Sequence, residues 1–258
     1  MPHYKPPAGC LKGRAVLITG AGDGLGRMAA LTYGQYGAEV ILLGKTVSKL
    51  EAVYDEIVGL GAPEPAVYPM DLAGASVRDY RDLANHVQDQ IGHLDGILHN
   101  AAALELLTPL EVHSLDVWDR TLRVNITAPF LLTQACLPLL RAAKDSAVIF
   151  TSDECAVTPK GYWGAYGASK AAVNNLAFMW TAELSDASVR VNVLDPGPVR
   201  TEMRLRTHPG APLSSWPLPE ALMPAYVYFM GPDGANHRGQ LIQAQDWIDA
   251  SVDDRRGG

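Results

Sequence analysis

Residues 14–36 join a short apolar run to a segment of helical periodicity through a turn that is rich in glycine. The run at 15–19 has the composition of a buried strand, and residues 27–36 are compatible with a helix. Gly20, Gly24 and Gly26 lie in the turn in a TGxxxGxG arrangement. Glycines there permit a tight turn and a close approach of a pyrophosphate to the main chain at a helix N-terminus. We therefore expect a strand–turn–helix unit that binds a nucleotide.

Apolar runs and amphipathic segments alternate along the rest of the chain. The expected strands after the first lie at residues 39–43, 66–70, 96–99, 147–150, 189–194 and 239–244. The expected helices lie at residues 47–60, 76–91, 115–143 and 165–184, with a break near Pro138. Strands that alternate with helices of this length need crossover connections. The pattern predicts an α/β, doubly wound Rossmann fold with a mainly parallel sheet of about seven strands and helices on both faces.

The segment at residues 196–219 is the exception to this alternation. It contains six prolines and little periodicity, so it is expected to be a long loop. A long loop that follows a strand end lies where open α/β sheets bind ligands. We assign residues 201–219 as a substrate loop within one domain, which spans residues 1–258 and has its core at about 13–244.

The composition disfavours several other classes of protein. With 48% hydrophobic and 19% charged residues, the chain can bury a sizeable core. Its formal net charge of -7 would repel nucleic-acid phosphates, so no nucleic-acid partner is expected. The three cysteines have no disulfide or metal-site spacing, so no metal is expected. Because the sequence contains no secretory signal and no apolar run of membrane-spanning length, we expect a cytoplasmic protein without a membrane partner.

Further motifs follow the glycine-rich turn in a fixed order. They are Asp71 after the third expected strand, Asn100-Ala101-Ala102 after the fourth, Asn125 in the long helix, the YxxxK motif from Tyr166 to Lys170, and Pro196-Gly197 with Thr201. This ordered set resembles the short-chain dehydrogenase/reductase family over nearly the whole chain. Only His99 and Ala102 depart from the NNAG turn of that family. The segments at 162–170 and 219–231 are similar to a bacterial branch described only as uncharacterised oxidoreductases.

The resemblance implies an NAD(P)(H)-dependent oxidoreductase that transfers a hydride between nicotinamide and a small carbonyl or alcohol substrate. It implies that Tyr166 is the general acid/base, that Lys170 lowers the pKa of Tyr166 and binds the nicotinamide ribose, and that Asn125 positions water in a proton relay. The chemistry of the pair agrees with these roles. Residues four apart on a helix share a face, and an ammonium near a phenol stabilises the phenolate.

The sequence departs from the family at the residue thirteen positions before the tyrosine, which is Asp153 where the family has a serine. An ionised carboxylate cannot donate a hydrogen bond to the substrate oxygen and would repel a developing alkoxide. Three interpretations remain open. Ser152 substitutes for the serine; Asp153 is protonated or accepts a hydrogen bond from a hydroxyl-bearing or cationic substrate; or carbonyl chemistry has been lost. We favour weak or atypical catalysis, with Ser152 and Asp153 both lining the site.

The choice between NADP and NAD depends on the end of the second strand, where an acid favours NAD and a base favours NADP. Lys45 stands there and no acid does, so we expect NADP(H) to be preferred and NAD(H) to be possible. Thr46, Ser48 and Arg27 are further candidates for this end of the cofactor. The resemblance implies the following cofactor-binding residues: Gly20, Gly22, Asp23, Gly24, Leu25, Gly26, Lys45, Asp71, Leu72, Asn100, Ala101, Ala102, Tyr166, Lys170, Pro196, Gly197, Val199 and Thr201.

The resemblance also implies self-association. The helices at 115–143 and 165–184 correspond to the main dimer surface of the family, so a homodimer or homotetramer is expected. Two alternatives to an enzyme stay open. One is a non-catalytic dinucleotide-binding sensor or scaffold that has lost the serine. The other, a purely structural oligomerising domain, leaves the ordered motifs without a purpose.

Overall fold

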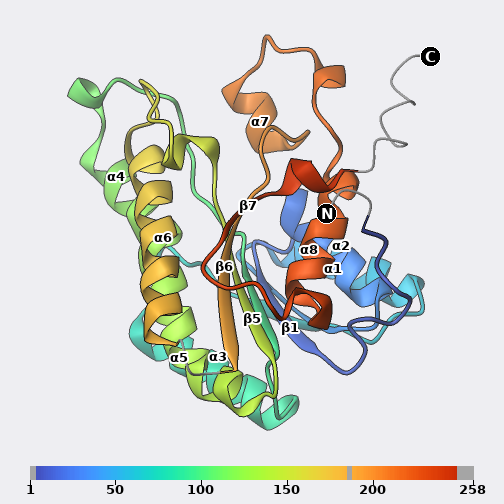
Figure 1. Cartoon of the computed structure of the whole chain (residues 1–258). Coiled ribbons are helices and arrows are strands. Elements are labelled where there is room, and N and C mark those ends of the chain that lie inside the picture. The colour runs from blue at the N-terminus through green and yellow to red at the C-terminus, as the bar shows by residue number, and fades with distance from the viewer. Residues whose placement is uncertain (1–3, 185–187, 249–258) are drawn as a thin grey trace.

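A parallel sheet forms the centre of this computed structural model, which describes residues 4–184 and 188–248 (Figure 1). Its strands are β1 (Ala15–Thr19), β2 (Glu39–Gly44), β3 (Ala66–Pro69), β4 (Gly96–His99), β5 (Ser146–Thr151), β6 (Val189–Asp195) and β7 (Leu241–Gln243). They are ordered β3-β2-β1-β4-β5-β6-β7, and every neighbouring pair is parallel. The sheet order reverses direction between β1 and β4, which is where such sheets bind ligands. The predicted doubly wound fold is confirmed.

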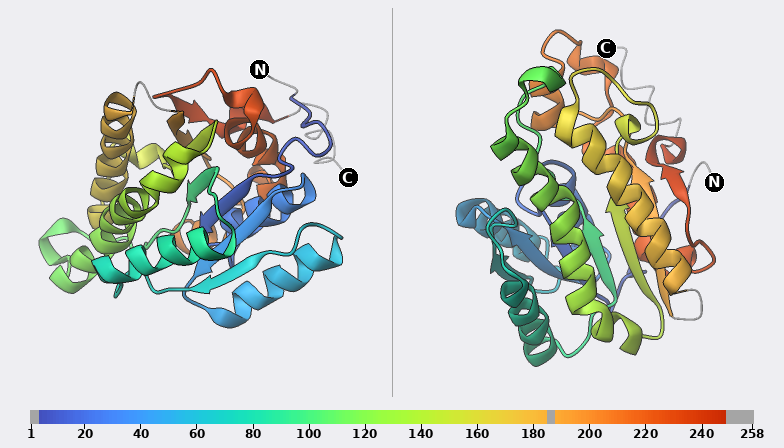
Figure 2. Two further views of the ribbon diagram at one scale, coloured as in Figure 1. Left: turned by 90° about the horizontal axis from the view of Figure 1, so that it is seen from below. Right: turned by 90° about the vertical axis from the view of Figure 1, so that its left-hand side faces the viewer.

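Helices cover both faces of the sheet (Figures 1 and 2). One face carries α1 (Gly24–Gln35), α2 (Val47–Gly59) and α8 (Met223–Met230). The other carries α3 (Val77–Gln90), α4 (Leu115–Leu122), α5 (Ala128–Ala142) and α6 (Gly164–Glu183). The side chains of β1 alternate between these faces, so that Ile18 belongs to the first core and Leu17 to the second. Burial on both faces explains why the strands are continuous apolar runs.

The helix predicted at 115–143 is interrupted at a different place from the one expected. Pro138 lies inside α5, which continues through it, whereas a π-helical turn at Arg123–Thr127 separates α4 from α5. Asn125 lies in this turn, and its side-chain amide bonds to the main chain of Ala103 beyond β4. These tertiary bonds secure the turn that carries Asn125, and π turns are frequent at functional sites.

The segment at 196–219 is also more ordered than predicted. It contains α7 (Glu202–Thr207) and a short 3-10 turn at Leu213–Ser215. The Thr201 side chain caps α7 by accepting a hydrogen bond from the Arg204 amide at 3.3 Å. A helix of this length has too little apolar periodicity to be recognised in a proline-rich segment. The expected long loop therefore contains one short helix.

A cluster of charged side chains ties the strands together at the edge opposite the strand ends that carry the motifs. Asp145, just before β5, forms ion pairs with Arg14 and with Arg190 of β6. Arg190 is 1% exposed, and its Nη2 donates to the Gly231 carbonyl at 2.6 Å, at the end of α8. Burial lowers the pKa of Arg190 to about 9. This cluster therefore links β1, β5, β6 and α8.

His99 occupies the position at which the family motif has an asparagine. The ring stacks on Phe150 with 4.6 Å between ring centroids, and its Nε2 lies 2.8 Å from the Thr133 hydroxyl of α5. Burial lowers the pKa of His99 to about 3, so the ring is neutral. This histidine therefore packs β4 against β5 and α5 in the core.

Candidate active site

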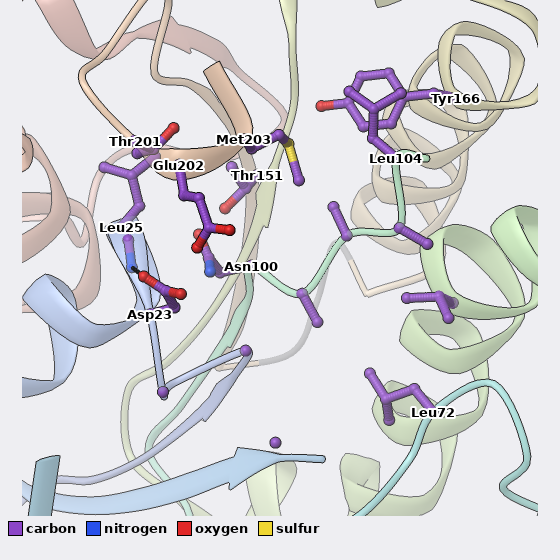
Figure 3. Close-up of a pocket in the computed structure, with 18 of the residues that line it drawn as sticks. Asp23, Leu25, Leu72, Asn100, Leu104, Thr151, Tyr166, Thr201, Glu202 and Met203 are labelled. Carbon is purple, nitrogen blue, oxygen red and sulfur yellow. Dashed lines mark hydrogen bonds between the residues drawn. The ribbon is translucent and has the colours of Figure 1, made fainter. Parts of the chain in front are cut away.

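A cavity of about 440 Å³ opens at the carboxyl edge of the sheet, and residues of α7 form part of its wall. It brings together nearly all the predicted site residues, which come from the segments that follow β1, β2, β3, β4, β5 and β6 and from the start of α6. Every predicted cofactor-binding residue except Gly26 lines it, and so do Ser152 and Asp153. Figure 3 shows Tyr166 and Leu104 on one side of the cavity, across from Thr201, Glu202 and Asp23. Gly26 and Asn125 lie outside its lining.

The glycine-rich turn packs so closely that a side chain would clash at Gly20, Gly22 and Gly26. Gly20 has a φ of 69°, and a Cβ there would lie 2.9 Å from the Cα of Ala101. A Cβ on Gly26 would lie 2.2 Å from the Gly20 carbonyl oxygen. Asp23 caps α1 by accepting a hydrogen bond from the Gly24 amide at 2.7 Å. The turn therefore presents open main chain to the cavity, and Gly26 serves the packing of α1 rather than direct contact.

Replacing Gly26 by alanine is expected to destabilise the fold by about 1–3 kcal/mol, because the new methyl group overlaps main-chain atoms that cannot move freely. The affinity for a nicotinamide dinucleotide is expected to fall as the turn shifts. Thermal unfolding and calorimetric titration measure the two effects. Gly59→Ala is the matched control, since a Cβ at Gly59 meets nothing within 4 Å. Equal stability of the two variants would contradict the close packing of the turn.

Tyr166, Lys170 and Asp153 meet at the far end of the cavity. The Tyr166 hydroxyl donates to Asp153 Oδ2 at 3.3 Å, and the Cys155 amide donates to Asp153 Oδ1 at 2.9 Å. Lys170 Nζ donates to the Thr151 carbonyl at 2.7 Å and lies 5.5 Å from the centroid of the Tyr166 ring. Asp153 therefore occupies the hydrogen-bonding position beside the tyrosine that the family gives to serine.

The electrostatics of this group differ from the sequence prediction. Burial raises the pKa of Tyr166 well above its usual value, and the Asp153 carboxylate raises it further. Burial lowers the pKa of Lys170. The sequence predicts that Lys170 lowers the pKa of Tyr166, whereas in this structure desolvation and the nearby carboxylate set the direction of the shift. Only the tertiary structure brings the carboxylate to the phenol.

Ser152 lies beside Asp153 on the cavity wall. Its amide donates to the Leu194 carbonyl at 2.8 Å, which joins the end of β5 to β6. Its hydroxyl is buried and has no hydrogen-bond partner within the described part of the chain. The protein leaves the bonding capacity of this hydroxyl unused, but the side chain must turn toward the cavity to reach a substrate, as one of the three interpretations of Asp153 requires.

Asn125 is held entirely by the protein. Its Oδ1 accepts from the Ala103 amide at 2.7 Å, and its Nδ2 donates to the Ala103 carbonyl at 3.1 Å and to the Ser169 hydroxyl at 2.9 Å. These bonds join the π turn to α6, one residue before Lys170. Because the side chain is engaged, any water relay at Asn125 must use the main-chain carbonyl groups of the turn.

Apolar side chains beyond the predicted site residues pack against Tyr166. Leu104, Cys155 and Trp163 form a buried cluster with Tyr166, and Met203 of α7 packs against it. The rings of Trp163 and Tyr166 lie 5.7 Å apart. Trp163 immediately precedes α6. Its closeness to the YxxxK motif is a sequence signal that could have identified it as a site residue.

A second lysine lines the opposite end of the cavity with Lys45 and Thr46. This residue, Lys49, is in the first turn of α2 and forms an ion pair with Asp23 at 2.5 Å. Lys49 lies four residues after Lys45 in the sequence, and this closeness could have identified it as a candidate for the same end of the cofactor. Arg27 instead forms an ion pair with Glu56 of α2, and neither Arg27 nor Ser48 lines the cavity.

The segment at Pro196–Thr201 is held over the cavity by a residue near the end of the described chain. Gln245 Nε2 donates to the Pro196 carbonyl at 3.2 Å and to the Pro198 carbonyl at 2.6 Å. Gly197, with a φ of 61°, leaves room for this amide. Gln245 is distant in sequence, so no local pattern indicated it.

Two kinds of feature are absent from the described residues. They contain no group of three or more His, Cys, Asp or Glu side chains that could hold a metal ion. Nor do they contain a helix of the length and apolarity needed to cross a membrane.

The fold and the site agree with a comparison of the sequence against known families. A family model described as short chain dehydrogenase matches residues 14–210. The chain belongs to this family of oxidoreductases.

Individual relatives cover nearly the whole chain. The uncharacterized oxidoreductase YciK of Escherichia coli strain K12 is 37% identical, over 94% of this chain and 96% of its own length. A solved structure of a short chain dehydrogenase from Pseudomonas syringae is 40% identical, covers 95% of this chain and 100% of its own, and has a TM-score of 0.92. Another, from Shigella flexneri and complexed with NADP, is 36% identical, covers 93% of this chain and 100% of its own, and has a TM-score of 0.90.

Proposed function

We propose that this protein is an NADP(H)-dependent oxidoreductase that transfers a hydride between nicotinamide and the polar double bond of a small molecule. The observation that carries the proposal is one continuous cavity, which joins the glycine-rich turn to Tyr166 and Lys170. Carbonyl and alcohol groups are the substrates that the family resemblance implies. The NADP bound to the Shigella flexneri relative supports the choice of cofactor.

The residues present fit a nicotinamide dinucleotide. The main chain of Gly22 and Gly24 lines the cavity without a side chain to cover it, which suits the pyrophosphate. Asp71 and Leu72 line the cavity beyond β3 and are the residues we assign to the adenine, and Pro196, Gly197, Val199 and Thr201 line it beyond β6 and are those we assign to the nicotinamide. When bound, the cofactor supplies or accepts the hydride.

The chain's own residues supply the remaining chemistry for a carbonyl substrate. Tyr166 holds the proton that the substrate oxygen needs. Lys170, whose Nζ is bonded to the Thr151 carbonyl, binds the nicotinamide ribose. Ser152 donates to the substrate oxygen, and the π turn at Asn125 carries the water relay. Leu104, Trp163 and Met203 exclude water from the reacting atoms.

Removing both lysines at the adenosine end is expected to weaken NADPH binding by about tenfold or more and to leave NADH binding nearly unchanged, because only NADPH carries the 2′-phosphate. The variant is Lys45→Ala with Lys49→Ala, and the measurement is calorimetric titration with each cofactor. The exposed Lys144→Ala is the control. If wild-type protein binds neither cofactor, the proposed function is wrong. If it binds NADPH but the double variant binds NADPH equally well, the assignment of the phosphate site is wrong.

We further propose that the protein is a cytoplasmic homodimer or homotetramer. Helices α5 and α6 lie side by side on one face (Figure 2), and Phe130, Phe178 and Met179 are partly exposed on them. Apolar surface of this kind is typical of symmetric interfaces. The free thiols of Cys10, Cys136 and Cys155 suit a reducing compartment.

A further inference from the structure

A carboxylate stands beside the tyrosine at the point where a substrate's polar atom must bind. We propose that the preferred hydride acceptor is the carbon–nitrogen double bond of an apolar, protonated imine, with Asp153 as the residue that selects it. The inference rests on the proposed hydride transfer and names the substrate class of that same site.

The carboxylate is fixed in orientation by the protein. Asp153 Oδ1 accepts from the Cys155 amide at 2.9 Å, and Oδ2 accepts from the Tyr166 hydroxyl at 3.3 Å. Oδ2 therefore faces the same space as the tyrosine oxygen, on the cavity wall. A carboxylate oxygen has more than one acceptor position, so Oδ2 can bond to a substrate N–H while it keeps the tyrosine.

The charged groups around Asp153 Oδ2 do not favour a negatively charged substrate atom. Lys170 is the nearby cation, but its Nζ is bonded to the Thr151 carbonyl at 2.7 Å, and Asp153 offsets its charge. Asp195 adds a second buried carboxyl group, which accepts from the Gly197 amide at 2.9 Å. Three arginines also line the cavity: Arg120 is paired with Glu105, the Arg204 guanidinium lies over the Trp216 ring, and Arg206 is exposed to solvent.

The two substrate classes change charge in opposite directions during hydride transfer. A carbonyl oxygen becomes alkoxide-like, which the Asp153 carboxylate repels. A protonated imine begins as a cation, which the carboxylate attracts, and ends as a neutral amine. The carboxylate also raises the fraction of bound imine that is protonated, and this is the form that accepts hydride.

The reaction balances without a proton from the protein. The imine carbon accepts a hydride and forms a C–H bond, while the π electron pair of C=N moves to nitrogen and cancels its positive charge. The reductant is the reduced nicotinamide of the proposed function, which is oxidised. The high pKa of Tyr166 is no obstacle to this step, because the tyrosine only needs to orient Asp153.

The walls define the rest of the substrate. Leu104, Trp163 and Met203 surround the tyrosine with apolar surface. An indole face also attracts a cation within about 6 Å of its centroid. These walls suit a compact apolar ring that carries the imine nitrogen.

The test compares methylpyrroline, a cyclic imine, with the ketone methylcyclopentanone, using NADPH and the full chain. Wild-type kcat/KM is expected to be at least about tenfold higher for the imine, and Asp153→Asn is expected to lower the imine value by about 100-fold. In a separate titration in the presence of NADP, methylpyrrolidinium is expected to bind Asp153→Asn at least about tenfold more weakly than wild type. Glu154→Gln is the matched control, since its carboxylate lies next in sequence but is exposed and paired with Lys160 at 2.6 Å.

NADPH affinity separates failure of the inference from failure of the proposed function. Equal NADPH binding by wild type and Asp153→Asn shows that the variant is folded. Three outcomes would overturn the inference alone. They are faster turnover of the ketone than of the imine, undiminished imine turnover in Asp153→Asn, and NADPH binding with turnover of neither compound. Absence of NADPH binding in wild type overturns the proposed function as well.

Discussion

Replacing Tyr166 by phenylalanine is expected to lower carbonyl reduction by a factor of about 10²–10⁴, the usual contribution of a positioned general acid. The ring would keep its packing against Trp163, while the hydroxyl that bonds to Asp153 at 3.3 Å would be lost. NADPH affinity is expected to change little, because the cradle at the glycine-rich turn is untouched. Steady-state rates and calorimetric titration measure the two quantities.

Asp153→Ser provides a background in which this prediction is sharpest. Serine can donate to a developing alkoxide, so carbonyl reduction is expected to rise, and adding Tyr166→Phe should abolish the gain. Tyr162→Phe is the control, because Tyr162 is 62% exposed and does not line the cavity. Unchanged carbonyl turnover in Tyr166→Phe would remove the tyrosine from the chemistry.

Replacing Arg190 by alanine is expected to destabilise the fold by about 2–5 kcal/mol, because it removes a large buried side chain and one of the two ion pairs of Asp145. Arg190 is 1% exposed, and its removal leaves a cavity beneath β6. It also leaves the Gly231 carbonyl without the guanidinium donor that lies 2.6 Å away. Chemical denaturation measures the loss, and the melting temperature should fall by about 10 °C for a chain of this size.

A solvent-exposed ion pair on the surface of α3 provides the control for this prediction. Arg78 and Asp82 of α3 are four residues apart, and the Arg78 side chain is 87% exposed. Arg78→Ala is expected to cost less than about 1 kcal/mol. If the two arginine variants had similar free energies of unfolding, the cluster around Asp145 would not be a structural link.

The elements of the sheet could be predicted because their signals are local. A strand buried on both faces is a continuous apolar run, as at residues 189–194, and a helix repeats its apolar side chains within one or two turns. The mainly parallel sheet also followed, because strands that alternate with helices need crossover connections. The motif residues end these strands, so their convergence at one edge was predictable too.

Other features depend on contacts that no local pattern encodes. The helical interruption is at Asn125 rather than Pro138, because Asn125 bonds to Ala103, 22 residues away. The Gln245 side chain donates hydrogen bonds to the carbonyl groups of Pro196 and Pro198, which lie 49 and 47 residues earlier in the sequence.

Tyr166 and Lys170 show the same difference between what the sequence determines and what the fold determines. The sequence by itself determined that Tyr166 and Lys170 share a helix face and that Asp153 replaces the expected serine, because helix periodicity and motif spacing are properties of the chain. Only the tertiary structure decided that Asp153 bonds to the tyrosine hydroxyl and that burial raises the pKa of Tyr166. Desolvation and Coulomb interactions depend on which groups the fold brings together and on how much water it excludes, and neither can be read along the chain.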